Sequence, residues 1–394
     1  MKILIINHFP LEGSGSGVYA QNIAISLMKK GHDVTVIMPA NTTNYLKIDG
    51  IKMHPVFFKK EEVIEGQLDF NFPCFTTHPE SIQSFYDLND SQINEYVSAF
   101  KRAIDEEIKE NKPDVIHAQH IWILASLAVD TGIKTVITAH GTDIIGHQKD
   151  DRFHKYTKNA VSKSKKIITI SKDNKKLVKD IFGVDSKKIE LMPNGYNPSK
   201  FYIDDVDKKT VLSKYGIEKD YKHIVSFAGK LTQIKGIDVL LRANKIYDND
   251  DTLTLLAGNG ELYEELNNLK DELGLKNTYF IGNQNHDDLR CIYNIADVSI
   301  VPSRVEGFGL VAIEALACGT PVITSDQGGL PEIVKKTKKQ DNLLVVTSFI
   351  IFFIISISNL NSNYTLKGNI LDIIILFISG LVEAIVTVLS GVSS

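Results

Sequence analysis

Short runs of β-branched and aliphatic residues alternate with charged stretches of helical period from residue 1 to about residue 335, and this alternation constrains the fold more than any other feature. It is typical of βαβ units, whose parallel strands are buried on both faces and so read as nearly continuous apolar runs. The fold class is therefore α/β. Strands are expected at residues 2–6, 33–38, 114–117, 135–139, 166–170, 189–192, 223–227, 253–257, 279–281, 298–301 and 321–324.

The expected strands fall into two sets, which the turn-rich segment Pro-Asn-Gly-Tyr-Asn-Pro at 193–198 separates. Each set is long enough for one doubly wound, Rossmann-like domain. We expect an N-terminal domain at 1–195 and a C-terminal domain at 196–340, with the turn-rich segment as linker and as the floor of a cleft between them. Ligands of such sheets bind beyond the carboxyl ends of the strands, so the loops there carry the candidate residues.

Composition excludes several other classes of protein. The chain has 44 Lys and Arg against 48 Asp and Glu, a formal net charge of −4, whereas nucleic-acid-binding domains carry a basic surplus. Its 3 cysteines show no Cys-x-x-Cys spacing, which argues against a disulfide framework and against a cysteine zinc site. The apolar run at 3–6 is too short for a signal peptide. We expect a cytoplasmic protein.

The end of the chain differs from the rest. Lysines crowd residues 335–339, residues 343–357 carry no charge, and 370–392 is interrupted only by Asp372 and Glu383. A bilayer span needs about 20 apolar residues and rarely holds carboxylates. We expect an atypical hydrophobic tail at 341–394, and three interpretations stay open: a frameshifted or chimeric end, a membrane hairpin with the lysines on the cytoplasmic side, and an unusual buried end.

A glycine-rich loop, Gly-Ser-Gly-Ser-Gly at 13–17, follows the first strand and leads into a helix expected at 18–30. A dinucleotide-binding loop would follow the strand at once and would need an acidic residue at the end of the second strand, and this chain has neither. A plain turn and a loop that faces an acceptor or a phosphate remain as interpretations. Small residues such as Gly15 and Gly17 let backbone approach a ligand closely.

Histidines gather at the ends of strands in the N-terminal set: His117 and His120 after one strand and His140 after the next. Three imidazoles could hold zinc, but their spacing matches no ligand motif, so we expect no metal. Structural histidines are an alternative for His117 and His120. His140, at a strand end before a glycine, is expected to position polar substrate groups or to relay a proton.

Two lysines lie near the start of one helix in the C-terminal set. Lys230 follows a strand, and Lys235 precedes a helix expected at 237–247. Ammonium groups beside the N–H groups of a helix start form an anion site sized for a diphosphate, although solvated surface lysines are the alternative. Gly258 lies in a strand–turn–helix segment that suits a nucleotide or a tight turn.

The most informative segment is 301–321, in which a strand, a glycine turn and a helix expected at 309–318 follow one another. Glu306 lies in the loop and Glu314 on the helix. A carboxylate on an otherwise apolar helix is costly unless hydrogen-bonded, and a ribose diol would supply two donors. The amides of residues 307–310 would point at an anion on the helix end.

Together, the Glu-x7-Glu element, the Gly-Lys-x4-Lys-Gly element, the Asn-Gly linker and the glycine-rich first loop resemble the family-four retaining glycosyltransferases of GT-B fold. The resemblance covers residues 1 to about 335 and is most specific at 306–321. It implies two Rossmann-like domains that face each other across a cleft, the second incomplete because the tail departs from the family pattern. Lys230 stands where arginine is more frequent, and Asn197 where aspartate often closes the Asn-Gly motif.

By that resemblance, Glu314 would bind the nucleotide ribose, Glu306 would contact the donor sugar, Lys230 and Lys235 would bind the diphosphate, and His140 would lie beside the donor sugar. No cofactor and no divalent metal are implied. The candidate catalytic residues are His140 and Glu306, and the candidate donor-binding residues are Gly15, Gly17, Lys230, Lys235, Gly258, Gly307, Phe308, Gly309, Leu310 and Glu314.

The implied reaction is transfer of a sugar, with retained configuration, from a nucleoside-diphosphate sugar to a hydroxyl of a glycolipid, polysaccharide or small molecule. Two alternatives remain: an inactive chain that at most binds nucleotide, and a sugar-nucleotide epimerase of the same fold. Residues 155–188 hold 11 lysines and 3 aspartates. They form either a solvated face or a patch that docks on an anionic membrane surface.

Overall fold

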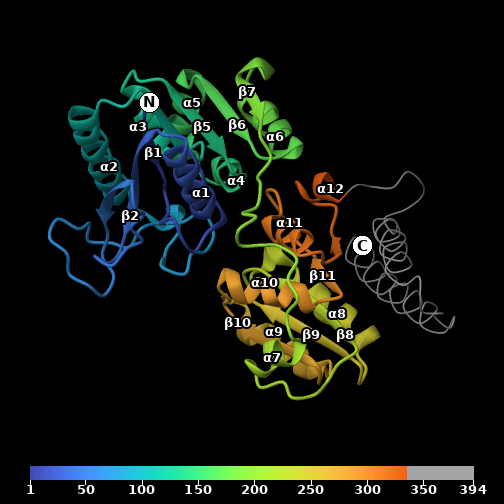
Figure 1. The fold of residues 1–394 in the computed structure, drawn as a ribbon. Helices are drawn as coiled ribbons and strands as arrows, with labels where there is room; N and C mark the ends of the chain where they lie inside the picture. Colours follow the sequence, from blue (N-terminus) through green and yellow to red (C-terminus); the bar gives the residue numbers. More distant parts are fainter. Residues whose placement is uncertain (335–394) are drawn as a thin grey trace. The chain divides into compact units, whose positions relative to one another are not determined.

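The computed structural model describes residues 1–334. By their internal contacts these residues divide into two compact units, one from Met1 to Asn194 and one that begins at Gly195. Each is a parallel sheet covered by helices, as the labels in Figure 1 allow the reader to follow. The predicted tail at 341–394 and its three interpretations lie outside the described residues.

The first unit is built on a parallel sheet of strand order β3-β2-β1-β4-β5-β6-β7. The order reverses between β1 and β4, which is the topological switch point at which doubly wound sheets bind ligands. Its strands are β1 (Lys2–Ile6), β2 (Asp33–Ala40), β3 (Lys52–Phe57), β4 (Val115–Gln119), β5 (Thr135–Ala139), β6 (Lys166–Thr169) and β7 (Ile189–Leu191). Its α-helices are α1 (Gly15–Lys29), α2 (Asp90–Asn111), α3 (Ile123–Asp130), α4 (Thr142–Lys149), α5 (His154–Lys163) and α6 (Lys172–Phe182).

The second unit repeats the plan in a smaller sheet of order β10-β9-β8-β11-β12, also parallel. Its switch point lies between β8 and β11. The strands are β8 (His223–Ala228), β9 (Thr252–Ala257), β10 (Thr278–Gly282), β11 (Val298–Val301) and β12 (Val322–Thr324). The α-helices are α7 (Lys208–Ser213), α8 (Ile237–Tyr247), α9 (Tyr263–Glu272), α10 (His286–Ile295), α11 (Leu310–Ala317) and α12 (Leu330–Ile333).

The α/β fold class predicted from the alternating pattern is confirmed, and every predicted strand is present within two residues at either end. The strand that the pattern missed is β3, which carries Pro55 in its middle. Proline is tolerated in a sheet at an edge, and β3 is an edge strand that pairs only with β2 within the described residues.

The first helix starts earlier than predicted. α1 begins at Gly15 instead of Val18, because Ser14 caps it and accepts the N–H of Gly17 at 3.0 Å. Gly15 and Gly17 therefore belong to the first helical turn and not to a loop. A Cβ on Gly17 would lie 2.3 Å from the carbonyl oxygen of Pro10, so glycine is required for the close approach of the chain that follows β1.

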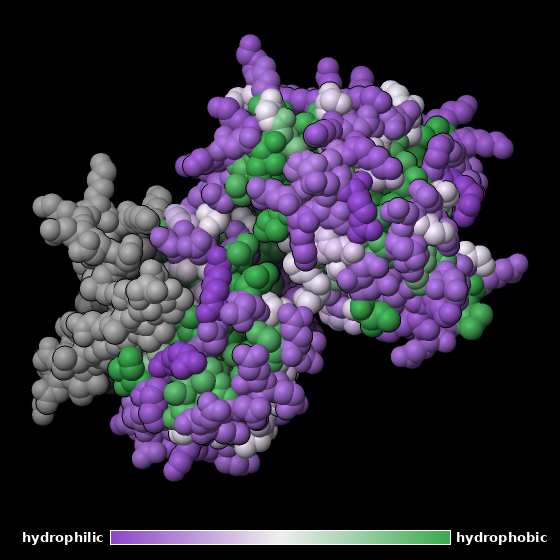
Figure 2. Space-filling model, turned by 180° about the vertical axis from the view of Figure 1, so that it is seen from behind, coloured by the Kyte–Doolittle hydropathy of each residue, from purple (hydrophilic) through white to green (hydrophobic). Residues whose placement is uncertain are grey.

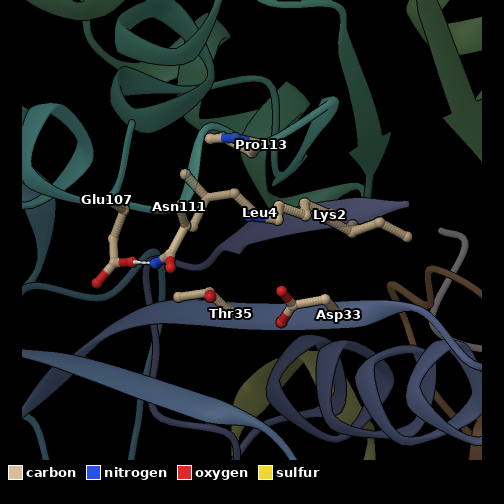
Figure 3. Close-up of a pocket in the computed structure, with 8 residues that line it drawn as sticks. Lys2, Leu4, Asp33, Thr35, Glu107, Asn111 and Pro113 are labelled. Carbon is tan, nitrogen blue, oxygen red and sulfur yellow. Dashed lines mark hydrogen bonds between the residues drawn. The ribbon is translucent and has the colours of Figure 1, made fainter. Parts of the chain in front are cut away.

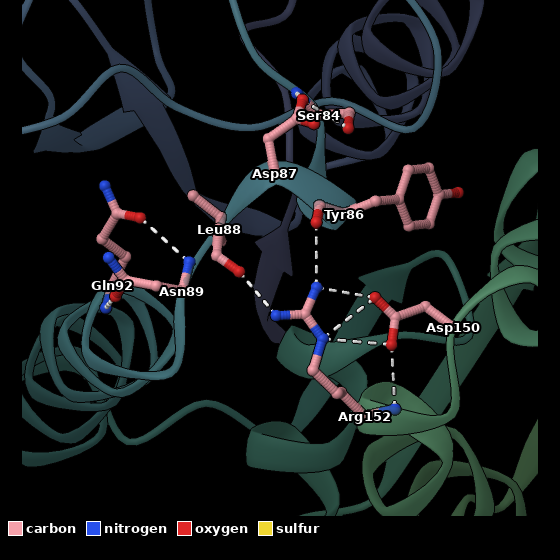
Figure 4. Close-up of polar contacts among 8 residues, drawn as sticks. All are labelled: Ser84, Tyr86, Asp87, Leu88, Asn89, Gln92, Asp150 and Arg152. Atoms are coloured by element: carbon pink, nitrogen blue, oxygen red, sulfur yellow. Dashed lines mark hydrogen bonds and ion pairs between the residues drawn. The ribbon is translucent and has the colours of Figure 1, made fainter.

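A long connection between β3 and α2 is held against the end of α4 by one arginine. Arg152 donates to the carbonyl oxygens of Leu88 at 2.6 Å and Tyr86 at 3.0 Å, and it pairs with Asp150 at 2.7 Å (Figure 4). Asn89 and Gln92 then form the capping box that starts α2. Irregular backbone is thus tied down by a charge-assisted network beside the sheet.

The face of the first unit in Figure 2 is mainly hydrophilic, with small scattered apolar patches. Within the described residues, no helix has the length and apolar character needed to cross a membrane.

A pocket of about 10 Å³ at the amino ends of β1 and β2, beside Glu107 and Asn111 (Figure 3), has room for about one water.

Candidate functional site

In the first unit, His140 lies directly after β5, and its geometry is set by Asp143. One carboxylate oxygen of Asp143 accepts the N–H groups of His140 at 3.1 Å and Gly141 at 2.8 Å, and the other accepts the N–H of Ile121 at 2.7 Å. Asp143 is fully buried. Burial raises the pKa of Asp143, and the three backbone donors oppose that rise. The carboxyl thus joins the loops that follow β4 and β5.

The ring of His140 is held by a second contact. Its Nε2 donates to Oε1 of Gln119, the last residue of β4, at 2.9 Å, which leaves Nδ1 unprotonated. Burial lowers the pKa of His140 to about 3, so the imidazole is neutral at neutral pH. A neutral ring with a fixed tautomer suits the positioning of a polar substrate group better than it suits proton relay.

The other predicted histidines also lie at this edge. Burial lowers the pKa of His117 to about 4 and the pKa of His120 well below its usual value. His117 bonds Thr138 at 2.8 Å, whereas the two ring nitrogens of His120 have no hydrogen-bond partner among the described residues. Residues 1–334 contain no group of three or more His, Cys, Asp or Glu arranged to hold a metal ion.

The helix that carries Gly15 and Gly17 contacts His140 through another of its residues. Tyr19, in the second turn of α1, lies with its ring centroid 5.1 Å from that of His140. Gly15 and Gly17 lie one turn earlier on the same helix. Tyr19 carries a buried phenol whose pKa burial raises, and it bonds Thr138 at the end of β5.

In the second unit, Glu306 and Lys235 form an ion pair with 2.7 Å between Oε2 and Nζ. Ser303 donates to the same carboxylate oxygen at 3.1 Å. Lys235 ends the 3-10 turn η4 (Gln233–Lys235) after β8, and Glu306 lies in the loop after β11. The two charges thus meet at the switch point of the second sheet. Lys230 is half-buried in the same post-β8 loop.

Backbone segments approach so closely at this edge that only glycine fits. A Cβ on Gly258 would lie 1.8 Å from the oxygen of Gly229, and one on Gly236 would lie 2.2 Å from the oxygen of Pro302. A Cβ on Gly328 would lie 1.6 Å from the oxygen of Glu306. All three glycines have positive φ angles, of 142°, 66° and 56° respectively. The loops that follow β8, β9, β11 and β12 are therefore locked together.

Glu314 lies on α11 and differs from Glu306 in its surroundings. Its carboxyl is half-buried and makes no hydrogen bond or ion pair within residues 1–334. Burial raises the pKa of Glu314 to about 7. Gly307, Phe308, Gly309 and Leu310 form the turn that starts α11, and Gly309, at φ 100°, is its N-cap. The N–H groups of that helix start are available to an anion.

The candidate residues are divided between the two units: Gly15, Gly17 and His140 lie in the first, and Lys230, Lys235, Gly258, Glu306, Gly307, Phe308, Gly309, Leu310 and Glu314 lie in the second. Sequence reasoning missed Gln119, Asp143 and Ser303 as residues that orient His140 and Glu306. Asp143 had a usable signal, because an Asp just inside a helix that follows a strand can accept the loop N–H groups before it.

Two parallel α/β units with polar residues gathered at both switch points define the class of GT-B enzymes. The chain belongs to the glycosyl transferases of group 1: residues 207–348 match that family, and residues 13–200 match glycosyltransferase family 4. An uncharacterized glycosyltransferase of Methanocaldococcus jannaschii is 30% identical over 358 residues, which cover 85% of this chain and 83% of the relative.

Solved structures agree on the fold. A sucrose-phosphate synthase from Thermosynechococcus elongatus superposes with a TM-score of 0.69 at 18% identity, over 98% of this chain and 94% of that one. An Anabaena protein in complex with UDP and glucose superposes with a TM-score of 0.63 at 17% identity, over 100% of this chain and 98% of that one. The GT-B fold is therefore established for this chain.

Proposed function

We propose that this chain is a retaining glycosyltransferase that moves a hexosyl group from a nucleoside-diphosphate sugar to a hydroxyl acceptor. The observation that carries the proposal is the meeting of Glu306 and Lys235 at the switch point of the second sheet, 2.7 Å apart. A carboxylate can bind sugar hydroxyls and an ammonium can bind a diphosphate, so the pair presents both partners that a sugar nucleotide requires.

The chemistry follows from charge placement. As the bond between the anomeric carbon and the diphosphate oxygen breaks, negative charge grows on the diphosphate, where Lys230, Lys235 and the N–H groups at the start of α11 stabilise it. The acceptor oxygen bonds to the anomeric carbon on the face that the diphosphate leaves, and the acceptor proton passes to a diphosphate oxygen. His140 positions a sugar hydroxyl. No divalent metal enters this scheme.

Glu314 would bind the nucleoside. Its unpaired carboxyl on α11 matches a ribose diol, whose two hydroxyls would donate to it and repay the cost of its burial. Gly258 would support the nucleotide site indirectly, because the absence of a Cβ lets the loop after β9 pack against the oxygen of Gly229 in the loop after β8. The choice of UDP for a first test rests on the Anabaena protein, which was solved with UDP and glucose.

The test is incubation of the purified full chain with UDP-, GDP- and ADP-sugars, with products separated chromatographically. Release of free nucleoside diphosphate or transfer to an added acceptor supports the proposal. Isomerised donor without release would instead identify an epimerase, and no turnover with intact nucleotide binding would identify an inactive chain. Lys235→Met should abolish turnover with UDP-sugars, whereas Lys222→Met, remote in the same unit, should not.

We also propose that the enzyme works at an anionic membrane surface, as acceptors of the glycolipid class would require. Lys172, Lys175, Lys176 and Lys179 are spaced so that they share one face of α6. Each exposed lysine near such a surface adds up to about 1 kcal/mol of binding. By contrast, Lys163 is paired with Asp130 at 2.6 Å and is already neutralised.

Co-sedimentation with vesicles tests this second proposal. Binding to vesicles that contain phosphatidylglycerol should exceed binding to pure phosphatidylcholine, and replacing Lys175, Lys176 and Lys179 by Gln should remove the excess. Lys163→Gln is the matched control and should leave it unchanged. Equal binding to both vesicles would refute a charged membrane patch.

A further inference from the structure

A second pocket, of about 440 Å³, opens in the first unit between the last turn of α4, α5 and the end of α6. Small-molecule sites have volumes of about 300–1,000 Å³. His147, which lines the pocket, lies near the C-terminal end of α4. His140 lies before the N-terminal end of the same helix. The pocket is therefore separate from the candidate residues described above and large enough for a ligand.

One wall of this pocket is cationic. Lys158 on α5 and Lys188 before β7 both line it. Lys188 donates to the carbonyl oxygens of Val161 at 2.6 Å and Ser162 at 2.9 Å near the end of α5, which fixes its ammonium and leaves one hydrogen. Burial lowers the pKa of Lys188. An anion in the pocket would meet a lysine that is already ordered.

His147 adds a neutral polar group to the same wall. Its Nδ1 lies 2.8 Å from Oγ1 of Thr157, and that hydroxyl donates to the carbonyl oxygen of His154 at 3.1 Å. The hydroxyl can then only accept from His147, so Nδ1 carries the hydrogen, and Nε2 can only accept a hydrogen from an O–H or N–H group of a ligand. Burial, followed by the charges of His154 and Lys158, lowers the pKa of His147.

One carboxylate, that of Asp185, also lines the pocket. Asp185 already accepts the N–H of Lys187 at 2.9 Å, as the cap of the 3-10 turn η3 (Ser186–Lys188). The lining therefore carries two ammonium groups and one carboxylate, and its net charge is positive.

The other wall of the pocket is apolar. Ile181 and Phe182 end α6, Gly183 turns the chain in a left-handed conformation at φ 64°, and Val184 continues the wall. Val161 closes it from α5. A free anion would use only the cationic wall, whereas a ligand with both an anionic and an apolar part would use the whole pocket.

We propose that this pocket binds a phosphate ester that carries an apolar substituent. The phosphate accepts from Lys158 and Lys188, its protonated oxygen donates to Nε2 of His147, and the apolar part lies against Ile181 and Phe182. Such an ester is either the headgroup region of an anionic phospholipid or a soluble metabolite. The inference uses no residue of the proposed transfer reaction, so the two can fail independently.

Calorimetric titration of the full chain with dihexanoyl phosphatidic acid, a monomeric probe, tests the site. We expect saturable binding of one molecule, and we expect inorganic phosphate to bind about tenfold more weakly or worse, because it buries no apolar surface. Absence of saturable binding would overturn the proposal. Equal affinity for inorganic phosphate would show that the apolar wall does not contribute to binding and would overturn that part of the proposal.

Variants locate the binding. Lys158→Gln should weaken binding of the phosphatidic acid probe about tenfold, because one charge-assisted hydrogen bond is lost. Lys155→Gln is the matched control, since Lys155 is exposed on the same helix and does not line the pocket. Ser162→Phe fills the rim without a change of charge and should weaken the probe similarly. If Lys158→Gln and Lys155→Gln have equal effects, the probe does not bind in this pocket.

Vesicles distinguish the two sources of the ester. If a lipid is the ligand, Ser162→Phe should reduce co-sedimentation with phosphatidic acid vesicles while Lys155→Gln should not. Binding of the soluble probe that depends on the pocket, with vesicle binding that does not, identifies a soluble ester. If neither variant changes vesicle binding and the soluble probe does not bind, the pocket is not a binding site.

Discussion

Asp143 is the residue on which the geometry around His140 depends. Three backbone N–H groups from two loops converge on its two oxygens, and no other acceptor in the described residues is bonded to them. An isosteric amide keeps one acceptor oxygen but turns an NH₂ group toward an N–H donor. At a buried position an unsatisfied pair of donors costs about 1–3 kcal/mol.

Asp143→Asn is therefore expected to destabilise the protein by about 1–3 kcal/mol and to lower kcat for sugar transfer more than it raises KM, because His140 loses its position. Thermal denaturation and steady-state kinetics measure the two effects. Asp180→Asn, an exposed replacement on α6, is the control and should stay within about 0.5 kcal/mol. An Asp143→Asn protein with unchanged kinetics would remove Asp143 from the positioning role.

The proposed role of Glu314 in ribose binding can be tested by the pH dependence of donor affinity. With its pKa raised to about 7 by burial, the carboxyl of the empty protein gains charge as the pH rises through that value. Ribose hydroxyls donate to the charged form, so affinity for UDP-glucose should rise by up to about tenfold per pH unit below the pKa and level off above it. UDP-glucose is chosen because its diphosphate does not titrate in this range.

Glu314→Gln should flatten that profile and weaken binding at about pH 8 by about tenfold or more. Glu265→Gln, exposed on α9, should keep the wild-type profile. Titration calorimetry at several pH values gives both curves. A wild-type affinity that is constant across the range would contradict the ribose assignment.

At the scale of elements, α1 tests whether the glycine segment is built for close approach. Alanine favours a helix over glycine by about 1 kcal/mol, but a Cβ on Gly17 would lie 2.3 Å from the oxygen of Pro10. The clash outweighs the propensity because backbone and not a side chain must move. We expect Gly17→Ala to lower the melting temperature, whereas Asn22→Ala on the exposed face of the same helix should leave it equal or higher. A stabilised Gly17→Ala protein would show that the segment tolerates a wider approach.

The elements differ in how far they could be predicted from the sequence. Buried parallel strands are nearly uniform apolar runs, so their places were predictable from residues alone. β3 was not, because Pro55 argues against a strand unless the strand is known to lie at an edge, and edge position is a property of the whole sheet. The start of α1 was missed because glycines suggested a loop where Ser14 supplies a cap.

The candidate residues were predictable where they follow strand ends. Their partners were not predictable, since the pairing of Glu306 with Lys235 and of His140 with Gln119 joins residues at or beyond the ends of different strands. Such contacts depend on strand order, which no local pattern specifies.

At the scale of the whole molecule, the two units should respond differently to acid. Burial lowers the pKa of five histidines in the first unit, so each of them reduces its stability as the pH falls below their ordinary value of 6.5, whereas the raised pKa of the single carboxyl of Asp143 acts in the opposite direction. These histidines are His8, His117, His120, His140 and His147. In the second unit Glu314 acts in the opposite direction, because its raised pKa makes the folded state more stable as the pH falls from about 7 toward 4.5.

The chain's only tryptophan, Trp122, is fully buried in the first unit and reports on it alone. On acidification we expect the Trp122 fluorescence transition to precede the loss of the far-ultraviolet circular dichroism signal, which comes from both units. His117→Gln should move the fluorescence transition to lower pH and leave the later phase in place. Coincident transitions in the wild-type protein would mean that the units unfold together.

The glycines that lock the loops at the edge of the second sheet limit how the proposed donor site could be redesigned. Gly236, Gly258 and Gly328 each leave no room for even a methyl group against neighbouring backbone. Libraries that randomise these positions would consist mostly of misfolded members. Neighbouring positions such as Leu310 and Asn259 are better choices for randomisation, because new side chains there need not disrupt the packing of the loops.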